Sequence, residues 1–179
     1  MTILSMDSYK VLLEQLPNWP GNYLEIGVYQ GDMLRDFALR WPDKTFYGID
    51  PFISDFGTVG HTGVPEGERM EVQREKAKEN FMDVPNIIFF EQTSESFSFQ
   101  NTDEELVKMG VSVVYVDGAH SYEHTLNDLY LSERLIPGNG LIYIDDWDLP
   151  EVLEATNDFI PEMKHRIQTH DKHSIFLQP

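Results

Sequence analysis

The sequence predicts an α/β fold with a doubly wound, mostly parallel sheet and a C-terminal antiparallel hairpin. Three observations lead to this prediction: strand-like and helix-like segments alternate, the central strand-like runs are almost wholly apolar, and two short β-like runs follow the last helix. Alternating strands and helices favour parallel strands joined by right-handed crossovers. Continuously apolar strands are typical of a sheet covered on both faces. Because no repeat or linker divides the sequence, we expect one domain over residues 1–179.

The expected elements follow from the spacing of apolar residues. A leading amphipathic helix that stops at Pro17 is predicted by apolar residues at helical spacing, namely Tyr9, Leu12, Leu13 and Leu16. The expected parallel strands are Tyr23–Ile26, Thr45–Ile49, Ile87–Phe90, Ser112–Val116 and Gly140–Ile144. The expected helices between and after them are Leu34–Trp41, Glu68–Phe81, Asp103–Met109, Ser121–Leu135 and Pro150–Phe159. The hairpin strands are expected at Lys164–Thr169 and Ser174–Leu177.

Bulk composition excludes several classes of protein and partner. Hydrophobic residues make up 41% and charged residues 25%, which is typical of a folded globular chain rather than a disordered one. The apolar runs are too short to cross a bilayer. The formal net charge of -18 disfavours nucleic-acid and anionic membrane partners, and the lack of cysteine excludes disulfides and thiolate metal sites. We expect a cytoplasmic protein, and the sequence leaves a homo-oligomer open.

A glycine-containing loop after the first expected strand predicts a site for an adenosyl ligand. Glu25 comes just before it, and Gly27 and Gly31 allow a sharp turn that a ligand can approach closely. A dinucleotide site normally has a further glycine between such a pair. The bulkier residues here are compatible with S-adenosylmethionine, which has no pyrophosphate. Asp50 ends the second strand, where a carboxylate accepts hydrogen bonds from ribose hydroxyls, and Ser94 follows the third strand near the expected adenine edge.

Carboxylates gather after the fourth and fifth expected strands. Asp117 follows the fourth strand and Asp145 and Asp146 follow the fifth, and the ends of neighbouring strands lie about 4.8 Å apart. Crowded like charges favour a bound cation, and oxygen ligands select hard ions such as Mg²⁺, Mn²⁺ or Ca²⁺. The alternative is that these residues only cap helices and turns. His120, three residues after Asp117, is a candidate general base near neutral pH, and a helix cap is the alternative.

Several motifs together resemble those of class I S-adenosylmethionine-dependent methyltransferases. The segments that carry the resemblance are Tyr23–Gly31, Gly48–Pro51, Asp117–His124, Leu135–Gly140 and Asp145–Trp147. The Asp-Gly-Ala-His-Ser-Tyr run and the Asp-Asp pair after the fifth strand are the most specific parts. They are similar to the branch that contains the metal-dependent macrocin and macrolide sugar O-methyltransferases.

The resemblance implies a Rossmann-like methyltransferase sheet and assigns roles to the motif residues. It implies that Mg²⁺ or Mn²⁺ is held by Asp117, Asp145 and Asp146, with His120 as the catalytic base. We expect the cofactor site to include Glu25, Gly27, Gly31, Asp50, Ser94 and Asp117. The implied reaction is the transfer of a methyl group from S-adenosylmethionine to a hydroxyl of a small molecule, a sugar or glycoside.

Two other functions are weighed against this interpretation. A non-catalytic module that binds an adenosyl ligand would show cofactor binding without metal dependence or turnover. A nicotinamide-dependent oxidoreductase is disfavoured by the missing middle glycine of the loop. The glycine-rich stretch Phe52–Gly67 is a candidate lid over the site, with a passive surface loop as the alternative.

Overall fold

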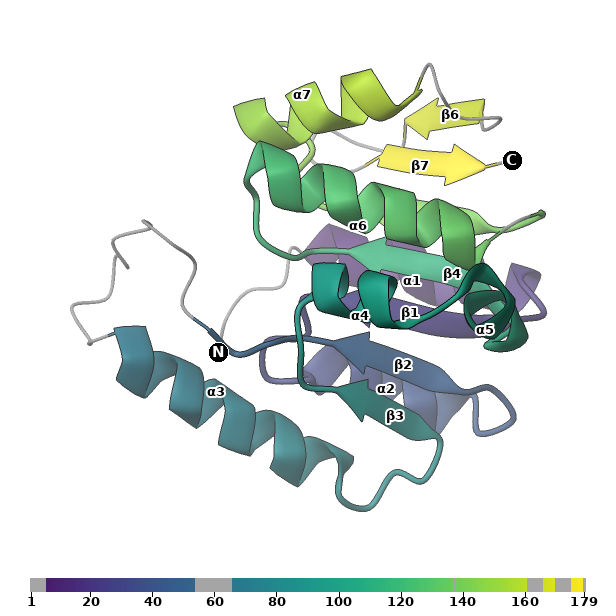
Figure 1. The fold of residues 1–179 in the computed structure, drawn as a ribbon. Helices are drawn as coiled ribbons and strands as arrows, with labels where there is room; N and C mark the ends of the chain where they lie inside the picture. Colours follow the sequence, from purple (N-terminus) through teal and green to yellow (C-terminus); the bar gives the residue numbers. More distant parts are fainter. Residues whose placement is uncertain (1–5, 54–65, 137, 161–165, 170–174, 179) are drawn as a thin grey trace.

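The strands form one sheet in the order β3-β2-β1-β4-β5-β7-β6 (Figure 1). The computed structural model describes residues 6–53, 66–136, 138–160, 166–169 and 175–178. The parallel strands are β1 (Asn22–Ile26), β2 (Phe46–Ile49), β3 (Ile87–Phe90), β4 (Val111–Val116) and β5 (Leu141–Ile144). At one edge β7 (Ile175–Gln178) pairs antiparallel with β5, and β6 (Arg166–Thr169) pairs antiparallel with β7. The predicted parallel α/β sheet is confirmed.

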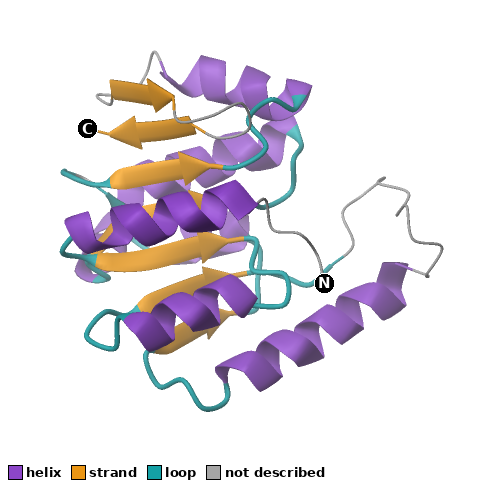
Figure 2. Ribbon diagram, turned by 180° about the vertical axis from the view of Figure 1, so that it is seen from behind, coloured by secondary structure: helices purple, strands orange, loops and turns teal. Residues whose placement is uncertain are grey.

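Helices cover both faces of this sheet. They are α1 (Met6–Gln15), α2 (Asp32–Arg40), α3 (Glu66–Phe81), α4 (Ser94–Gln100), α5 (Asp103–Lys108), α6 (Tyr122–Leu135) and α7 (Pro150–Phe159), and a short 3₁₀ turn, η1 (Leu16–Asn18), follows α1. The helices α4 to α7 lie on one face, and α1 and α2 lie on the other (Figure 2). The helix α3 extends away from the sheet beyond the β3 edge. None of the helices in the described ranges combines the length and apolar character needed to cross a membrane.

Each central strand contributes side chains alternately to two hydrophobic cores. On β4, Val114 and Val116 pack toward α4 to α7, whereas Val113 and Tyr115 pack toward α1 and α2. All residues of β4 are buried. This explains why the strand carries no polar alternation, because neither face meets water.

The switch in strand order positions the site. Since β1 is paired with β2 on one side and β4 on the other, and all three run parallel, their carboxyl ends share one edge. Chain connections leave this edge in opposite directions on either side of β1, and such points are where α/β sheets bind ligands. The expected site residues after β1, β2, β4 and β5 therefore converge on the same edge.

The structure also contains a helix that the sequence analysis did not predict. The residues after β3 lead directly into α4, whose start is capped by the Thr93 side chain accepting a hydrogen bond from the Ser96 N–H. Only Phe97 of this helix is buried, so its apolar periodicity is too weak to detect. The remaining element bounds agree to within two residues. Most of the expected lid, residues 54–65, lies outside the described residues.

The packing of α4 depends on one side chain, and this dependence is testable. Phe97 is 2% exposed and its ring centroid lies 4.7 Å from that of Phe90 on β3. Phe97→Ala should therefore lower the free energy of unfolding by about 3–5 kcal/mol, the usual cost of deleting a buried phenyl ring. Phe99→Ala is the matched control, because Phe99 lies in the same helix and is 90% exposed. Urea denaturation of both variants measures the difference, and equal stabilities would contradict this placement of α4.

Candidate active site

The loop after β1 is shaped by two glycines with left-handed backbones. Gly27 has φ of 86° and Gly31 has φ of 75°, a region that residues with a Cβ rarely adopt. A Cβ on Gly27 would lie 1.9 Å from the carbonyl oxygen of Asp117. A Cβ on Gly31 would lie 2.5 Å from the Phe81 ring. The loop therefore packs directly against the end of β4, and Gly31 is the N-cap residue of α2.

Asp50 holds this loop to the end of β2. Its Oδ2 atom accepts hydrogen bonds from the backbone N–H groups of Val28 and Tyr29, both at 2.9 Å, and its Oδ1 atom accepts one from Phe52 at 2.8 Å. Burial raises the pKa of Asp50, and these three bonds oppose that shift. The structure thus gives Asp50 a role in fixing the loop that the sequence analysis did not foresee. A contact between Asp50 and ribose stays a prediction.

Glu25 lies beneath the loop, inside the protein. Its side chain is 3% exposed, and its Oε2 atom accepts a hydrogen bond from the Tyr23 hydroxyl at 3.1 Å. Burial raises the pKa of Glu25 well above its ordinary value, and the nearby charges of Asp117 and Asp50 add to the shift. Its predicted place in the cofactor site stays a prediction, since the described contacts of Glu25 are all with the protein interior.

Ser94 is paired with a buried carboxylate that the sequence analysis missed. Its hydroxyl donates to Asp128 of α6, which is 2% exposed. Burial raises the pKa of Asp128 to about 7, although the Ser94 bond opposes the shift. Asp128 falls on the buried stripe of α6 with Thr125 and Leu129. An aspartate at an apolar position of the helix could therefore have indicated this buried carboxylate from the sequence.

Three side chains meet at the ends of β4 and β5. The Nε2 atom of His120 lies 3.5 Å from Asp117 Oδ1 and 3.5 Å from Asp146 Oδ2. One ligand atom from each of these residues lies within 4.8 Å of the other two. Burial raises the pKa of Asp117 to about 6, and the contact with His120 opposes that shift. The same contact with Asp117 raises the pKa of His120. We call these three residues the acidic group.

Asp145 lies next to the acidic group, and its role as a metal ligand stays a prediction. Its side chain is buried, with Oδ2 accepting a hydrogen bond from the Tyr115 hydroxyl at 2.5 Å and Oδ1 accepting one from the Asp146 N–H at 3.0 Å. Asp145 continues the side-chain alternation of β5, whereas Asp146 turns out of it with φ of 51°. Asp145 therefore borders the acidic group through its hydrogen bond with the Asp146 N–H.

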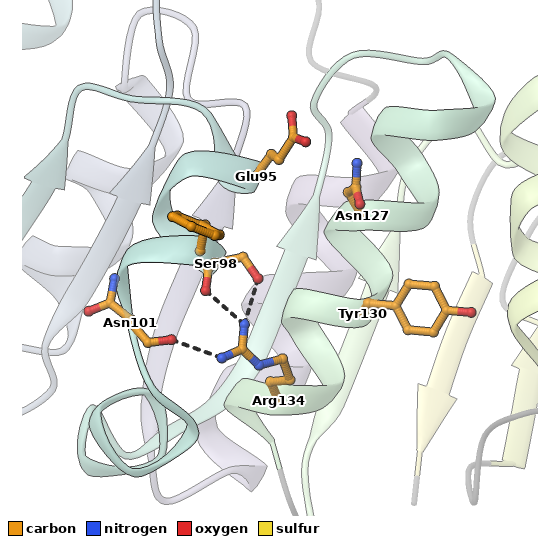
Figure 3. Close-up of a pocket in the computed structure, with 7 residues that line it drawn as sticks. Glu95, Ser98, Asn101, Asn127, Tyr130 and Arg134 are labelled. Carbon is orange, nitrogen blue, oxygen red and sulfur yellow. Dashed lines mark hydrogen bonds between the residues drawn. The ribbon is translucent and has the colours of Figure 1, made fainter.

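A cavity of about 410 Å³ lies elsewhere, between α4 and α6 (Figure 3). It is lined by Glu95, Ser98, Phe99, Asn101, Asn127, Tyr130 and Arg134. The Arg134 guanidinium is held by the Ser98 carbonyl and hydroxyl, the Asn101 carbonyl and the Asp103 carboxylate. Because none of the predicted site residues lines this cavity and its cation is already engaged, we assign it no role in the reaction.

The glycine loop, Asp50 and the acidic group all fall within one stretch that matches a protein family. The model of the methyltransferase domain family matches residues 24–147. The chain belongs to the methyltransferase domain family. This match confirms the prediction of a class I S-adenosylmethionine-dependent methyltransferase.

The individual proteins that resemble this chain share low sequence identity with it. An uncharacterized protein of Acanthamoeba polyphaga mimivirus is 23% identical over 148 residues, a match that spans 79% of this chain and 60% of that protein. The structure of CalS11, a calicheamicin methyltransferase, is 18% identical with a TM-score of 0.67, covering 98% of this chain and 79% of that one. The mycinamycin methyltransferase MycE, solved with Mg, SAH and mycinamycin VI, is 19% identical with a TM-score of 0.58, covering 96% of this chain and 48% of that one. At these identities the structural matches establish the shared fold.

The buried Asp128 carboxyl predicts a pH dependence of stability. Its pKa rises from an ordinary value of about 4 in the unfolded chain to about 7 in the folded protein. A carboxyl with a raised folded pKa contributes stability that is complete below the unfolded pKa and lost as pH rises through the folded pKa. Asp128→Asn keeps an oxygen for Ser94 but cannot ionise. Its stability relative to the wild type should therefore rise between about pH 4 and about pH 8, by an amount on the order of a few kcal/mol.

Urea denaturation of both proteins at matched pH values measures this difference. Other titrating groups are common to the two proteins and cancel in the comparison. A stability difference that stays constant across this pH range would contradict the buried, proton-binding environment of Asp128.

Proposed function

We propose that this methyltransferase transfers the methyl group of S-adenosylmethionine to a hydroxyl oxygen of a small molecule, a sugar or glycoside, with the help of a divalent metal ion. The observation that carries this proposal is the acidic group of Asp117, His120 and Asp146, which adjoins the glycine loop. A cofactor on the loop and a hydroxyl acceptor at the acidic group would lie side by side. Such juxtaposition is the main requirement of an in-line methyl transfer.

The donor atoms of the acidic group fit a hard divalent ion. Two carboxylates and one imidazole suit Mg²⁺ or Mn²⁺ better than a soft metal, and the described chain offers no thiolate because the sequence has no cysteine. Asp117 and Asp146 would hold the ion, with His120 next to it. When bound, a divalent ion supplies Lewis-acid polarisation of hydroxyl oxygens.

His120 is suited to accept the proton of the acceptor hydroxyl. Its side chain is 39% exposed, so a substrate can reach the ring, and its Nε2 atom points at the two carboxylates. Those carboxylates orient the imidazole and stabilise its protonated form after transfer, which is the arrangement of a general base next to an orienting acid. His124 lies outside this group and contacts the Ser121 hydroxyl through Nδ1 at 2.7 Å.

The acceptor class is supported by two structural neighbours. One is described as a TDP-rhamnose 3'-O-methyltransferase of calicheamicin biosynthesis. Another, a methyltransferase from the mycinamycin biosynthetic pathway, was solved in complex with Mg, SAH and mycinamycin VI. The first of these descriptions names a nucleotide sugar as the acceptor, and the charge of -18 on this chain gives no attraction for nucleic acid.

Cofactor binding is tested by Asp50→Ala. Since Asp50 fixes the loop through two backbone hydrogen bonds, its loss should weaken the affinity for S-adenosylhomocysteine by roughly 100-fold or more, measured by calorimetry on variants shown to be folded. Asp50→Asn, which keeps one acceptor oxygen, should lose less. Asp43 is exposed and precedes the amino-terminal end of β2. The control variant Asp43→Ala should therefore bind S-adenosylhomocysteine like the wild type. Unchanged affinity in Asp50→Ala would contradict the assignment of the loop.

The reaction is tested with labelled S-adenosylmethionine and a panel of sugars, nucleotide sugars and glycosides. The wild type should transfer label in the presence of Mg²⁺ or Mn²⁺ and lose this activity with a chelator. His120→Ala should lower turnover by about 10²–10⁴-fold, the usual contribution of a positioned base, and leave S-adenosylhomocysteine affinity unchanged. His124→Ala should behave like the wild type. Cofactor binding without transfer to any hydroxyl would instead support a non-catalytic adenosyl-binding module.

A further inference from the structure

A buried tyrosine lies directly beneath the acidic group. Tyr115 of β4 is 1% exposed, and its hydroxyl lies 2.5 Å from Asp145 Oδ2 and 3.2 Å from Asp117 Oδ2. Residues two apart on a strand project from the same face, so Tyr115 and Asp117 are stacked along β4. One phenol thus contacts carboxylates from the ends of two different strands.

The register of β4 and β5 places a second tyrosine beside Tyr115. Tyr115 pairs with Tyr143 in the parallel ladder, and an aspartate follows each tyrosine by two residues. The two rings lie 5.5 Å apart and both side chains are fully buried. The two tyrosines therefore lie directly beneath the two aspartates. Close packing restricts the orientation of the Tyr115 ring.

Asp145 connects Tyr115 to the acidic group through hydrogen bonds of both its carboxylate oxygens. Its second oxygen, Oδ1, accepts the backbone N–H of Asp146 at 3.0 Å. Asp146 has φ of 51°, a left-handed conformation that is uncommon for residues with a Cβ, although aspartate adopts it more readily than most. This turn directs the Asp146 carboxylate to within 3.5 Å of His120 Nε2. Two consecutive hydrogen bonds thus lead from the Tyr115 hydroxyl to Asp146, and a third contact leads from Asp146 to His120.

We propose that Tyr115 is a positioning residue that, through its hydrogen bond to Asp145, fixes the turn at Asp146 and the orientation of Asp117 so that the acidic group is preformed for a divalent ion. The inference rests on the metal-assisted function proposed above. A phenol is suited to this task because it donates one proton to a carboxylate without adding charge. Partners of this kind, one layer behind the ligands, typically change metal affinity by 10–100-fold.

Binding of Mn²⁺, followed by electron paramagnetic resonance, tests this inference. Tyr115→Phe keeps the ring and removes only the hydroxyl, and it should weaken Mn²⁺ affinity about 10–100-fold while S-adenosylhomocysteine affinity stays unchanged. Tyr23→Phe is the matched control, because Tyr23 is equally buried and its hydroxyl donates to Glu25 at 3.1 Å instead of to the strand-end aspartates. This variant should bind Mn²⁺ like the wild type.

A double-mutant cycle separates positioning from general destabilisation. Asp145→Asn preserves side-chain volume and should also weaken Mn²⁺ binding, and it provides the same test if Tyr115→Phe does not fold. In the double variant, the combined loss should be smaller than the sum of the two single losses, because the hydrogen bond between Tyr115 and Asp145 can be lost only once. Additive losses, or wild-type Mn²⁺ affinity in Tyr115→Phe, would overturn the inference. Absence of Mn²⁺ binding in the wild type would overturn the proposed metal-assisted function itself, which distinguishes the two failures.

Discussion

The crowding of carboxylates at the ends of β4 and β5 is the constraint on which the rest of the site depends. Parallel neighbours must end at the same edge, so their terminal aspartates are brought together whatever their mutual repulsion. The structure offsets this cost with donors of different kinds: the His120 ring next to Asp117 and Asp146, the Tyr115 hydroxyl, and the Asp146 N–H. The raised pKa of Asp117, about 6, shows that burial still disfavours its charge. A divalent cation is the partner that would neutralise such a group most completely.

The cofactor loop meets the same edge through close backbone contact. Gly27 leaves no room for a side chain against Asp117, and Asp50 joins the turn to the end of β2 through two backbone hydrogen bonds. A sheet of this kind hosts many unrelated reactions. The family match establishes a methyltransferase, and the nature of the acceptor and the use of a metal depend on the chemistry of these side chains.

The sequence predicted those features that arise from local pattern. Apolar runs located β1 to β5, and the position of Asp117, His120 and Asp146 just after the strands was enough to bring them to one edge. Features that depend on non-local contacts were missed. The hydrogen bond between the Tyr115 hydroxyl and Asp145 and the left-handed turn at Asp146 are examples, because residue spacing specifies neither of them. The helix α4 buries a single phenyl ring, so its spacing gives little signal. The hydrogen bond between Ser94 of α4 and Asp128 of α6 joins residues that are far apart in the sequence.

Anomalous diffraction from crystals grown with Mn²⁺ and S-adenosylhomocysteine tests the central claim most directly. The claim is that the carboxyl ends of β4 and β5 form a divalent-ion site beside the cofactor loop. It predicts one manganese peak within about 2.0–2.6 Å of carboxylate oxygens of Asp117 and Asp146, with S-adenosylhomocysteine lying along the loop from Gly27 to Gly31. A cofactor bound at the loop with manganese absent from this edge, or held at another place on the protein, would contradict it.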